Sequence, residues 1–307
     1  MKILITGCCG FIGSHLSEAL LKNNQDVIGI DLLSCDSKES NLEILQNYSN
    51  FVFVQESICM SQIIKIHQPT IVVHLSEPVE VSEKYIHNNI FGHTYLLNES
   101  IKNNVRRFIY ASSSSVYGNR STDKPFSEND TLEKLESPNA ISKQTCEKIT
   151  EILAKTTTTE CVCVRLFSVY GPRASLDMAP LKFCDAILKG KPIELYGNGT
   201  QKRDYTYIDD VVECLVRMVL HTKPISGIYN IGYGNPVSIL QLIDYLEEFI
   251  QVTGKICHKP APNMDTNTMY CDHVNSKFKE EFNFAPQISC RDGIKKMVDW
   301  MIQQHKN

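Results

Sequence analysis

The chain has no long hydrophobic run. Its longest apolar stretches, such as 71–75 and 3–5, have the length of a β-strand, whereas a membrane-spanning helix needs about 20 consecutive apolar residues. The first residues, MKILITG, lack the basic, apolar and small-residue regions of a secretory signal peptide. We therefore expect a cytoplasmic protein that has no membrane partner.

Charge of one sign is not in excess either. The chain has 31 Lys and Arg against 35 Asp and Glu, a formal net charge of -4. Proteins that bind nucleic acid usually carry a clear basic excess. The composition therefore argues against a nucleic-acid partner, and any phosphate group must be bound by a local arrangement of residues.

The twelve cysteines lack the spacing of a zinc site. Cys8 and Cys9 are adjacent and Cys161 is separated from Cys163 by one residue, but no C-x-x-C pair or histidine cluster occurs. In a chain without a signal peptide, such scattered cysteines are typical of reduced thiols that pack in a core. We expect no metal ion.

What the chain does have is the composition of a globular protein and a regular alternation of segments. Hydrophobic residues make up 42% and charged residues 21% of its 307 residues, which excludes disorder. Apolar, β-branched runs alternate with segments of helical period, which predicts βαβ units and a mainly parallel sheet covered on both faces. The predicted strands are 2–6, 26–31, 51–54, 70–74, 107–111, 160–166 and 227–231.

The alternation changes near residue 169, where turn-rich pieces interrupt short helices and strands. This change predicts a second, smaller α/β lobe that binds the substrate. We expect a first domain over 1–167 with a return segment at 206–228, and a second lobe made of 168–205 and 229–307.

A glycine-rich turn directly follows the first predicted strand. It reads GCCGFIG over 7–13 and leads into a helix pattern. Glycines there permit a tight turn and a close approach of the backbone to a pyrophosphate, and the helix N-terminus faces the anion. Asp31 ends the second strand, where a carboxylate binds ribose hydroxyls and disfavours the extra phosphate of NADP. The alternative is an incidental glycine-rich turn. The expected NAD-binding residues are Gly7, Gly10, Phe11, Ile12, Gly13 and Asp31.

These features, with many ordered motifs, resemble the extended short-chain dehydrogenases/reductases that act on nucleotide sugars, chiefly 4-epimerases and 4,6-dehydratases. The resemblance implies a Rossmann-type doubly wound fold. The phrases LDMA at 176–179 and GKPIELYGNG at 190–199 are most similar to UDP-glucuronate 4-epimerases. The other matching motifs are TGCCGFIGSHL, YASSSSVYG, PFSEND, SPNAISKQTCEK, RLFSVYGPR, RDYTYIDD and GIYNIGYGNPVSI.

The resemblance implies catalysis by transient oxidation of the sugar at C4. A tyrosinate is the family's base, a lysine four residues later lowers its pKa and holds the nicotinamide ribose, and a hydroxyl residue orients the sugar. Lys143 matches the lysine and Ser113 matches the hydroxyl residue, but Asn139 stands where the tyrosine belongs. An amide cannot act as a base near neutral pH. We expect slow turnover, and Asn139→Tyr should raise it by about two orders of magnitude or more.

Other positions divide between those that match the family and those that depart from it. Arg203 resembles the diphosphate-binding arginine, and Asp265, Ser114 and Ser168 complete the expected substrate site. The departures are Glu77 for a small residue of the family's HLAA motif, Ser57 for an acidic residue near the adenine, and Pro262 for an arginine near the C-terminus.

These observations leave three readings of the function. The first is an NAD-dependent 4-epimerase for a UDP-hexose or UDP-hexuronate, in which another group acts in place of the tyrosine or the tyrosine was deliberately replaced. The second is a catalytically silent protein that binds NAD and a sugar nucleotide. A 4,6-dehydratase is disfavoured because Ser114 and Ser115 replace that branch's Asp-Glu pair. The resemblance also implies a homodimer, formed through helices predicted at 84–102 and 139–155.

Overall fold

The structure, a computed structural model, describes residues 1–77, 85, 87–118, 124–132, 135, 137–260, 269–272 and 276–306. The chain forms two compact units. The first comprises Met1–Gly118, Thr131–Leu166 and Val212–Tyr229, and the second comprises Asn119–Asp130, Phe167–Val211 and Asn230–Asn307.

These units differ from the expected division in two places. The segment 119–130 groups with the second unit, where the backbone N–H of Phe126 donates to the carbonyl of Tyr270 at 2.8 Å and the N–H of Asn230 donates to Glu128 at 2.9 Å. The return to the first unit begins at Val212, inside a helix, rather than at residue 206.

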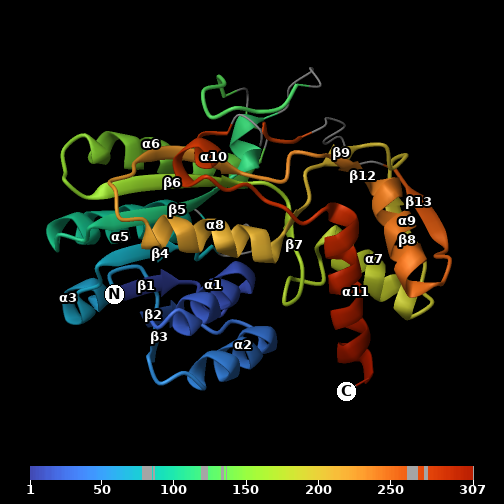
Figure 1. Ribbon diagram of the computed structural model, residues 1–307, viewed down its shortest axis with the longest axis horizontal. Helices are drawn as coiled ribbons and strands as arrows, with labels where there is room; N and C mark the ends of the chain where they lie inside the picture. The colour runs from blue at the N-terminus through green and yellow to red at the C-terminus, as the bar shows by residue number, and fades with distance from the viewer. Residues whose placement is uncertain are drawn as a thin grey trace. The chain divides into compact units, whose positions relative to one another are not determined.

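The first unit is built on a seven-stranded sheet with the order β11-β6-β5-β4-β1-β2-β3 (Figure 1). The pairs that join β3, β2, β1, β4, β5 and β6 are all parallel. The order reverses between β1 and β4, and ligands bind at such a switch point in open α/β sheets. The expected fold class, a Rossmann-type parallel sheet, is confirmed. The strands are β1 (Lys2–Thr6), β2 (Asp26–Asp31), β3 (Phe51–Gln55), β4 (Ile71–His74), β5 (Arg107–Ser113), β6 (Glu160–Leu166) and β11 (Gly227–Ile231).

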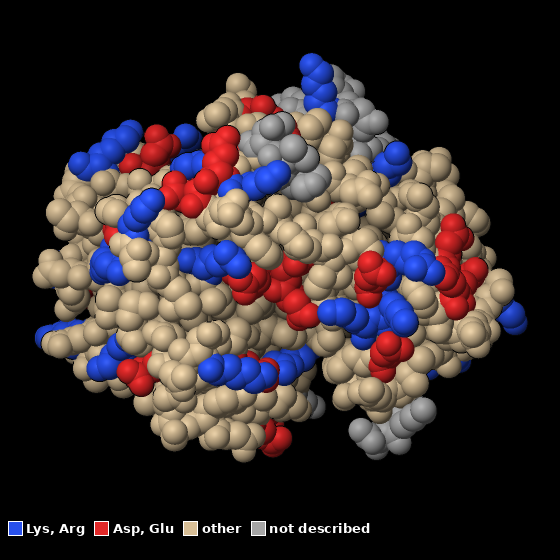
Figure 2. Space-filling view, in the orientation of Figure 1, with Lys and Arg blue, Asp and Glu red and all other residues tan. Residues whose placement is uncertain are grey.

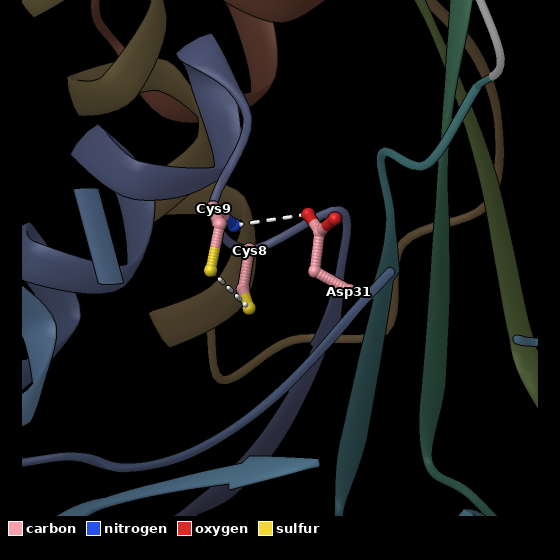
Figure 3. A group of neighbouring side chains, drawn as sticks. All are labelled: Cys8, Cys9 and Asp31. Atoms are coloured by element: carbon pink, nitrogen blue, oxygen red, sulfur yellow. Dashed lines mark hydrogen bonds between the residues drawn. The ribbon is translucent and has the colours of Figure 1, made fainter. Parts of the chain in front are cut away.

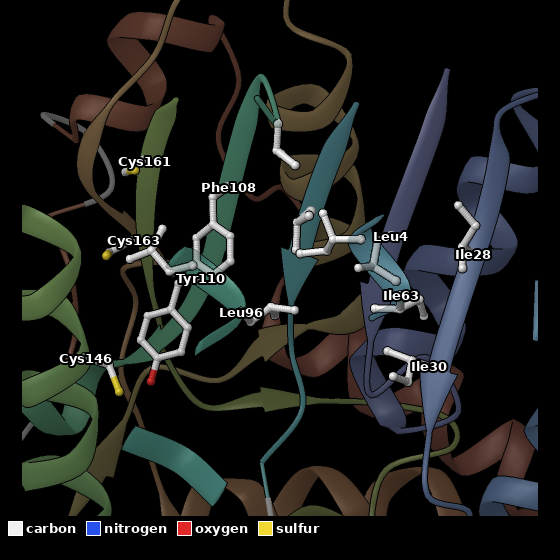
Figure 4. Close-up of a cluster of buried hydrophobic side chains, with 14 residues drawn as sticks. Leu4, Ile28, Ile30, Ile63, Leu96, Phe108, Tyr110, Cys146, Cys161 and Cys163 are labelled. Atoms are coloured by element: carbon white, nitrogen blue, oxygen red, sulfur yellow. The ribbon is translucent and has the colours of Figure 1, made fainter. Parts of the chain in front are cut away.

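A hydrophobic cluster covers one face of this sheet (Figure 4). Strand side chains alternate between the two faces, and the cluster takes every second residue of β2, β5 and β6. Helices α3, α5 and α6 supply the opposing side chains. This packing fixes α6, which carries two predicted site residues, against the carboxyl half of β5. The cluster includes Leu4, Ile28, Ile30, Leu96, Phe108, Tyr110, Cys146, Cys161 and Cys163.

Among the described helices of this unit, η2 and α6 begin at a serine whose side chain caps the first turn. For α6, the Ser137 side chain accepts the N–H of Ala140 at 3.1 Å and Pro138 occupies the first turn. The helix expected over 84–102 is a π-helical turn, η1, followed by α5, and its residues 84 and 86 lie outside the described part. The elements are α1 (Phe11–Lys22), α2 (Asp36–Gln46), α3 (Ile63–His67), η1 (His87–Phe91), α5 (Gly92–Lys102), η2 (Ser114–Tyr117), α6 (Pro138–Ala154) and α8 (Ile208–Leu220), of which α8 continues from the second unit.

The second unit combines helices with three two-stranded sheets, β10-β7, β12-β9 and β13-β8. Its helix α9 opens with a capping box, in which Ser238 and Gln241 satisfy each other's backbone N–H groups. Its elements are β7 (Val169–Tyr170), α7 (Ala179–Leu188), β8 (Ile193–Tyr196), β9 (Lys202–Arg203), β10 (Thr206–Tyr207), β12 (Val237–Ser238), α9 (Ile239–Ile250), β13 (Ile256–Lys259), α10 (Lys277–Phe282) and α11 (Cys290–Lys306).

The hydropathy of the described helices and the charge distribution in Figure 2 agree with the composition. No helix in the described part of the chain is long and apolar enough to cross a membrane. On the face drawn in Figure 2, basic and acidic side chains are interspersed rather than gathered into a patch of one sign. This face offers no broad basic surface of the kind that binds nucleic acid.

Candidate functional site

The glycine-rich turn between β1 and α1 is shaped for a dinucleotide. Gly7 has a φ of +68°, and a Cβ at Gly13 would lie 2.0 Å from the carbonyl oxygen of Gly7. The turn therefore admits no side chain at either position. Gly10 caps α1 without a side-chain hydrogen bond, so the first N–H groups of the helix are left for an anion such as a pyrophosphate. These residues fit the NAD that the resemblance implies.

Asp31, at the end of β2, has its carboxylate held in place by three donors. It accepts the N–H of Cys9 at 3.2 Å, the N–H of Leu33 at 3.1 Å and the Lys38 ammonium at 2.8 Å. The contact with Cys9 ties the carboxylate to the glycine-rich turn (Figure 3). The sequence predicted the position of Asp31 but not its pairing with Lys38, because α2 carries no signal for this pair.

The thiols of Cys8 and Cys9 lie 3.6 Å apart, and their sulfur atoms and an Asp31 oxygen fall within 4.8 Å of one another (Figure 3). Thiolates, not thiols, bind metal ions. The hydrogen bond to Cys9, together with burial, raises the pKa of Cys8, which keeps its thiol protonated. The Lys38 ammonium also neutralises Asp31. The two thiols are buried in the core, and Asp31 is already paired with Lys38.

Lys143 projects from α6 to the carboxyl end of β5. Its ammonium donates to the carbonyl of Ala111 at 2.8 Å and lies 5.1 Å from the ring centre of Tyr110. It also pairs with Glu77, at 2.9 Å. Two of its three donors thus have partners among the described residues. The side chain is 9% exposed, so the lysine is aimed into the unit rather than solvated on the helix surface.

Asn139, one turn before Lys143, is bonded through both ends of its amide. Its Nδ2 donates to Glu77 Oε1 at 2.7 Å, and its Oδ1 accepts the Ser115 hydroxyl at 3.2 Å. The Tyr85 hydroxyl donates to the same Glu77 oxygen at 3.3 Å. Glu77 therefore joins the two predicted catalytic positions on α6. The sequence marked Glu77 and Asn139 as separate departures and gave no sign that they meet.

Ser113 ends β5 and caps η2, where its hydroxyl accepts the N–H of Ser115 at 3.1 Å. Ser114 is the first residue of η2 and is buried. Because Ser115 also contacts Asn139, the short η2 helix brings the predicted serine segment and α6 together. Of the predicted substrate residues, Ser113 and Ser114 therefore belong to the first unit, beside Lys143.

A sealed ion pair, formed by Arg165 and Glu147, joins β6 to α6. It was not predicted from the sequence. Arg165 of β6 donates to both oxygens of Glu147 on α6, at 3.0 and 2.8 Å, and Ser112 donates to Glu147 as well. The two side chains are 2% and 3% exposed. Tyr117 is buried beneath the Arg165 guanidinium, whose Cζ lies 4.6 Å from the centre of the Tyr117 ring. The spacing of Glu147 four residues after Lys143 was the available signal.

Two histidines occupy the core rather than the site. His74 Nδ1 lies 2.8 Å from Thr6 Oγ1, and His93 Nε2 lies 2.9 Å from Thr150 Oγ1. Burial, with a smaller effect of the nearby Lys143 charge, lowers the pKa of His93 to about 3 and lowers that of His74. Both imidazoles are therefore neutral, and neither offers a charged group to a ligand.

The second unit holds a cavity of about 360 Å³ that brings two predicted substrate residues together. Ser168 and Arg203 both line it, Arg203 at the end of β9. Asp265 and Pro262 lie outside the described residues. The sequence missed most of the remaining lining, because apolar and aromatic positions in a turn-rich segment carry no pattern that points to a cavity. These further lining residues include Tyr170, Met178, Pro180, Gln201, Tyr205 and Ile239.

Comparison with known proteins agrees with this geometry. The NAD dependent epimerase/dehydratase family matches residues 3–232 of the chain. Protein CapI of Staphylococcus aureus is 33% identical, over 100% of both chains. A UDP-glucuronate 4-epimerase of Thermodesulfobacterium geofontis is also 33% identical, over 97% of this chain and 95% of that protein.

Solved structures give the same family. The UDP-glucuronic acid 4-epimerase from Bacillus cereus, in complex with UDP-glucuronic acid and NAD, has a TM-score of 0.91 and 34% identity, and the match covers 99% of this chain and 100% of that chain. The UDP-glucose 4-epimerase of Thermotoga maritima, with UDP-glucose, has a TM-score of 0.88 and 29% identity, covering 99% and 100%. The predicted resemblance is confirmed, and the chain belongs to the NAD-dependent epimerase/dehydratase family.

Proposed function

We propose that this protein binds NAD and a UDP-hexuronate or UDP-hexose and interconverts the C4 epimers of the sugar, slowly. The observation that carries the proposal is Lys143, a lysine that is almost fully buried yet keeps one donor without a partner among the described residues. It lies at the carboxyl end of β5 next to the serine segment, in the same unit as the dinucleotide turn. Nearly buried charged groups of this kind are common at functional sites, which supports the proposal.

The residues of the first unit divide the work of holding the cofactor. The N–H groups that follow Gly10 would face the pyrophosphate, Asp31 would accept the ribose hydroxyls, and Lys143 would hold the nicotinamide ribose. When bound, NAD supplies a hydride acceptor that can return the hydride to either face of the sugar ring. The Ser113 hydroxyl would orient the sugar oxygen.

We assign the nucleotide to the cavity of the second unit. An arginine fork matches diphosphate geometry bidentately, and Arg203 lines this cavity together with Ser168. Tyr205 and Tyr170 add aromatic surface. Several relatives are named for UDP-glucuronate or UDP-glucose, which supports a UDP-sugar as the ligand.

We further propose a homodimer in the cytoplasm, where the twelve free thiols stay reduced. Large apolar side chains are exposed on the two segments expected to form the interface, namely Phe91 at the end of η1 and Ile141 and Ile152 on α6. Burying these in a two-fold helix packing would remove them from water. Light scattering should give twice the chain mass, and Ile141→Glu with Ile152→Glu should give the single-chain mass.

The test of function has three measurements on the same preparation. Calorimetry should detect binding of NAD and of UDP-glucuronate, and product analysis should detect the C4 epimer at a low rate. Binding of both ligands without any product would support the silent-protein alternative, which is favoured by the charge of Lys143 being tied to Glu77. Failure to bind either ligand would refute the proposal.

A further inference from the structure

Two departures from the family pattern, 62 residues apart in the chain, are in direct contact. Glu77 stands where the family has a small residue, and Asn139 stands where it has the catalytic tyrosine. Asn139 Nδ2 donates to Glu77 Oε1 at 2.7 Å. Positions 77 and 139 therefore adjoin in the fold, and the residues that occupy them are an acceptor and a donor that pair.

Glu77 presents an oxygen to Lys143, the lysine that in the family assists the tyrosine. Its Oε2 lies 2.9 Å from the Lys143 ammonium, and its Oε1 lies beside the side chain at position 139. In the family arrangement, the phenol oxygen is the group between this lysine and the sugar. Here the group in contact with this lysine is a carboxylate, and a carboxylate accepts a proton while an amide does not.

The carboxylate still has room for one more donor. A carboxylate offers about four acceptor positions, and Glu77 uses three of them for Asn139, Tyr85 and Lys143. Its side chain is 26% exposed, whereas Glu147, which serves only to pair with Arg165 and Ser112, is 3% exposed. An ion-pair partner that merely neutralised Lys143 would not need this access to solvent.

The other titratable groups around Lys143 that the structure describes are poorly suited to take the proton. Tyr85 is 2% exposed, and burial raises the pKa of its phenol. Tyr117 is sealed beneath Arg165. His74 is buried, and its pKa is lowered well below the ordinary value, chiefly by that burial. Tyr110, whose ring centre lies 5.1 Å from the Lys143 ammonium, is 3% exposed, and burial raises the pKa of its phenol well above the ordinary value.

We propose that Glu77 is the general base of this protein in place of the absent tyrosine, and that Asn139 is a positioning residue that aims it. The inference rests on the proposed function. The proton of the sugar 4-hydroxyl would pass to Glu77 while the electron pair of the broken O–H bond becomes the second carbon–oxygen bond. NAD, when bound, would supply the acceptor for the hydride that leaves C4. Glu77 becomes the neutral acid and gives the proton back when the ketone is reduced.

The contact between Glu77 and Asn139 determines what a tyrosine restored at position 139 would meet. With Glu77 present, a phenol at position 139 would be placed against a carboxylate at the distance now spanned by the Asn139 amide. The family arrangement is therefore recreated by the double variant Glu77→Ala with Asn139→Tyr, rather than by Asn139→Tyr alone. The double variant serves as the positive control for the fold and for both binding sites.

The experiment compares the turnover of UDP-glucuronate by the full chain and by four variants. Glu77→Gln keeps the size of the side chain but cannot take a proton, so turnover should fall about 10²- to 10⁴-fold with affinity for NAD unchanged. Glu77→Ala should regain turnover when formate is added. Glu151→Gln removes an exposed glutamate of α6 that pairs with Lys148 and Lys155, and turnover should not change. The Glu77→Ala and Asn139→Tyr double variant should be active without formate.

A binding measurement tests the same contact without turnover. UDP-glucuronate should bind more tightly than its 4-deoxy analogue, by about tenfold or more, because a hydroxyl that donates to a carboxylate makes a charge-assisted hydrogen bond. Glu77→Ala should remove this difference.

The outcomes separate the inference from the function on which it rests. If the chain binds both ligands but Glu77→Gln turns over as fast as the unchanged chain, or if the unchanged chain is inactive while the double variant is active, Glu77 is not the base. If neither the chain nor the double variant binds NAD or UDP-glucuronate, the proposed function is wrong.

Discussion

Two carboxylates make ion pairs at α6, and they differ in almost every other respect. Glu147 lies on α6 itself, and Arg165 and Ser112 surround it deep in the first unit. Glu77 follows β4 and reaches Lys143 from the edge of the sheet. The first carboxylate is fully enclosed, and the second keeps an exposed side.

This difference in exposure distinguishes a carboxylate that supports the fold from one that is accessible to a ligand. A buried ion pair contributes little net stability compared with apolar residues of the same volume, but a great deal is lost if one partner is removed. A partly exposed pair costs little to break, and its exposed acceptor remains available to a ligand. Glu147 therefore fixes the inner face of α6, and Glu77 is the group that can meet a substrate.

The largest expected effect comes from breaking the sealed pair. Arg165→Leu leaves the Glu147 carboxylate buried without its partner, and the free energy of unfolding should fall by about 3–5 kcal/mol. Urea denaturation measures the change. The matched control is Arg217→Leu, which removes an exposed pair with Glu213 and should cost less than about 1 kcal/mol. Equal losses in the two variants would contradict the comparison.

The next largest effect is the loss of stability at low pH that comes from His93, which contacts Thr150 on the enclosed side of α6. His93 has a folded-state pKa of about 3 against 6.5 for a free histidine. As the pH falls from 6.5 toward 3, the unfolded chain binds a proton that the folded chain does not. The folded state is thus favoured above pH 6.5, and about 3 kcal/mol of unfolding free energy should be lost from this residue by pH 4.

The pH dependence of His93→Gln isolates this contribution. The variant should lose less stability between pH 6.5 and pH 4 than the unchanged chain does, even if it is less stable at neutral pH. Asp204, whose pKa is raised by burial, works in the opposite direction in both proteins and cancels in the difference. Parallel curves for the two proteins would mean that His93 is protonated in the folded state.

Asp31 with Lys38 adds a third pair to the comparison, at a cofactor site. The carboxylate should repel the extra phosphate of NADP, so calorimetry should give an affinity for NAD that is about tenfold higher or more, equal to about 1.4 kcal/mol. Asp31→Ser should narrow the preference, because Lys38 would then be able to pair with that phosphate. Equal affinity of the unchanged chain for both dinucleotides would refute the role of Asp31.

The smallest expected effect is on stability at the open pair. Glu77→Gln should lower the free energy of unfolding by about 1 kcal/mol, less than Arg165→Leu does, because Glu77 is partly solvated and the new amide oxygen still accepts a hydrogen bond from the nearly buried Lys143. Measuring Glu77→Gln and Arg165→Leu under the same conditions compares the contributions of the partly exposed pair and the sealed pair to the free energy of unfolding. A loss of several kcal/mol would class Glu77 with Glu147 as a supporting residue.

The sequence predicted the parts of this molecule that depend on local patterns. The seven strands of the described sheet lie where the apolar runs indicated, because strands covered on both faces are largely apolar. The dinucleotide turn followed from Gly7, Gly10 and Gly13, whose spacing reflects a backbone constraint. Lys143 and Asn139 followed from their offset on one helix.

Contacts between distant segments could not be predicted in this way. Nothing near Glu77 in the sequence specifies that its carboxylate meets Asn139 and Lys143, because the approach depends on how β4 and α6 pack. The same holds for the pairing of Lys38 with Asp31. The cavity that contains Arg203 is likewise assembled from turns that carry no periodic signal.

The hydrogen bond between Glu77 and Asn139 also constrains the order in which a lineage could have acquired the two residues. A glutamate arriving beside a tyrosine would have set a negative charge against the phenol and opposed its ionisation. An asparagine arriving first would have left Lys143 nearly buried and without a negatively charged neighbour. Each single change is therefore expected to be unfavourable alone and to be relieved by the other, so the two positions should tolerate a double change better than either single change.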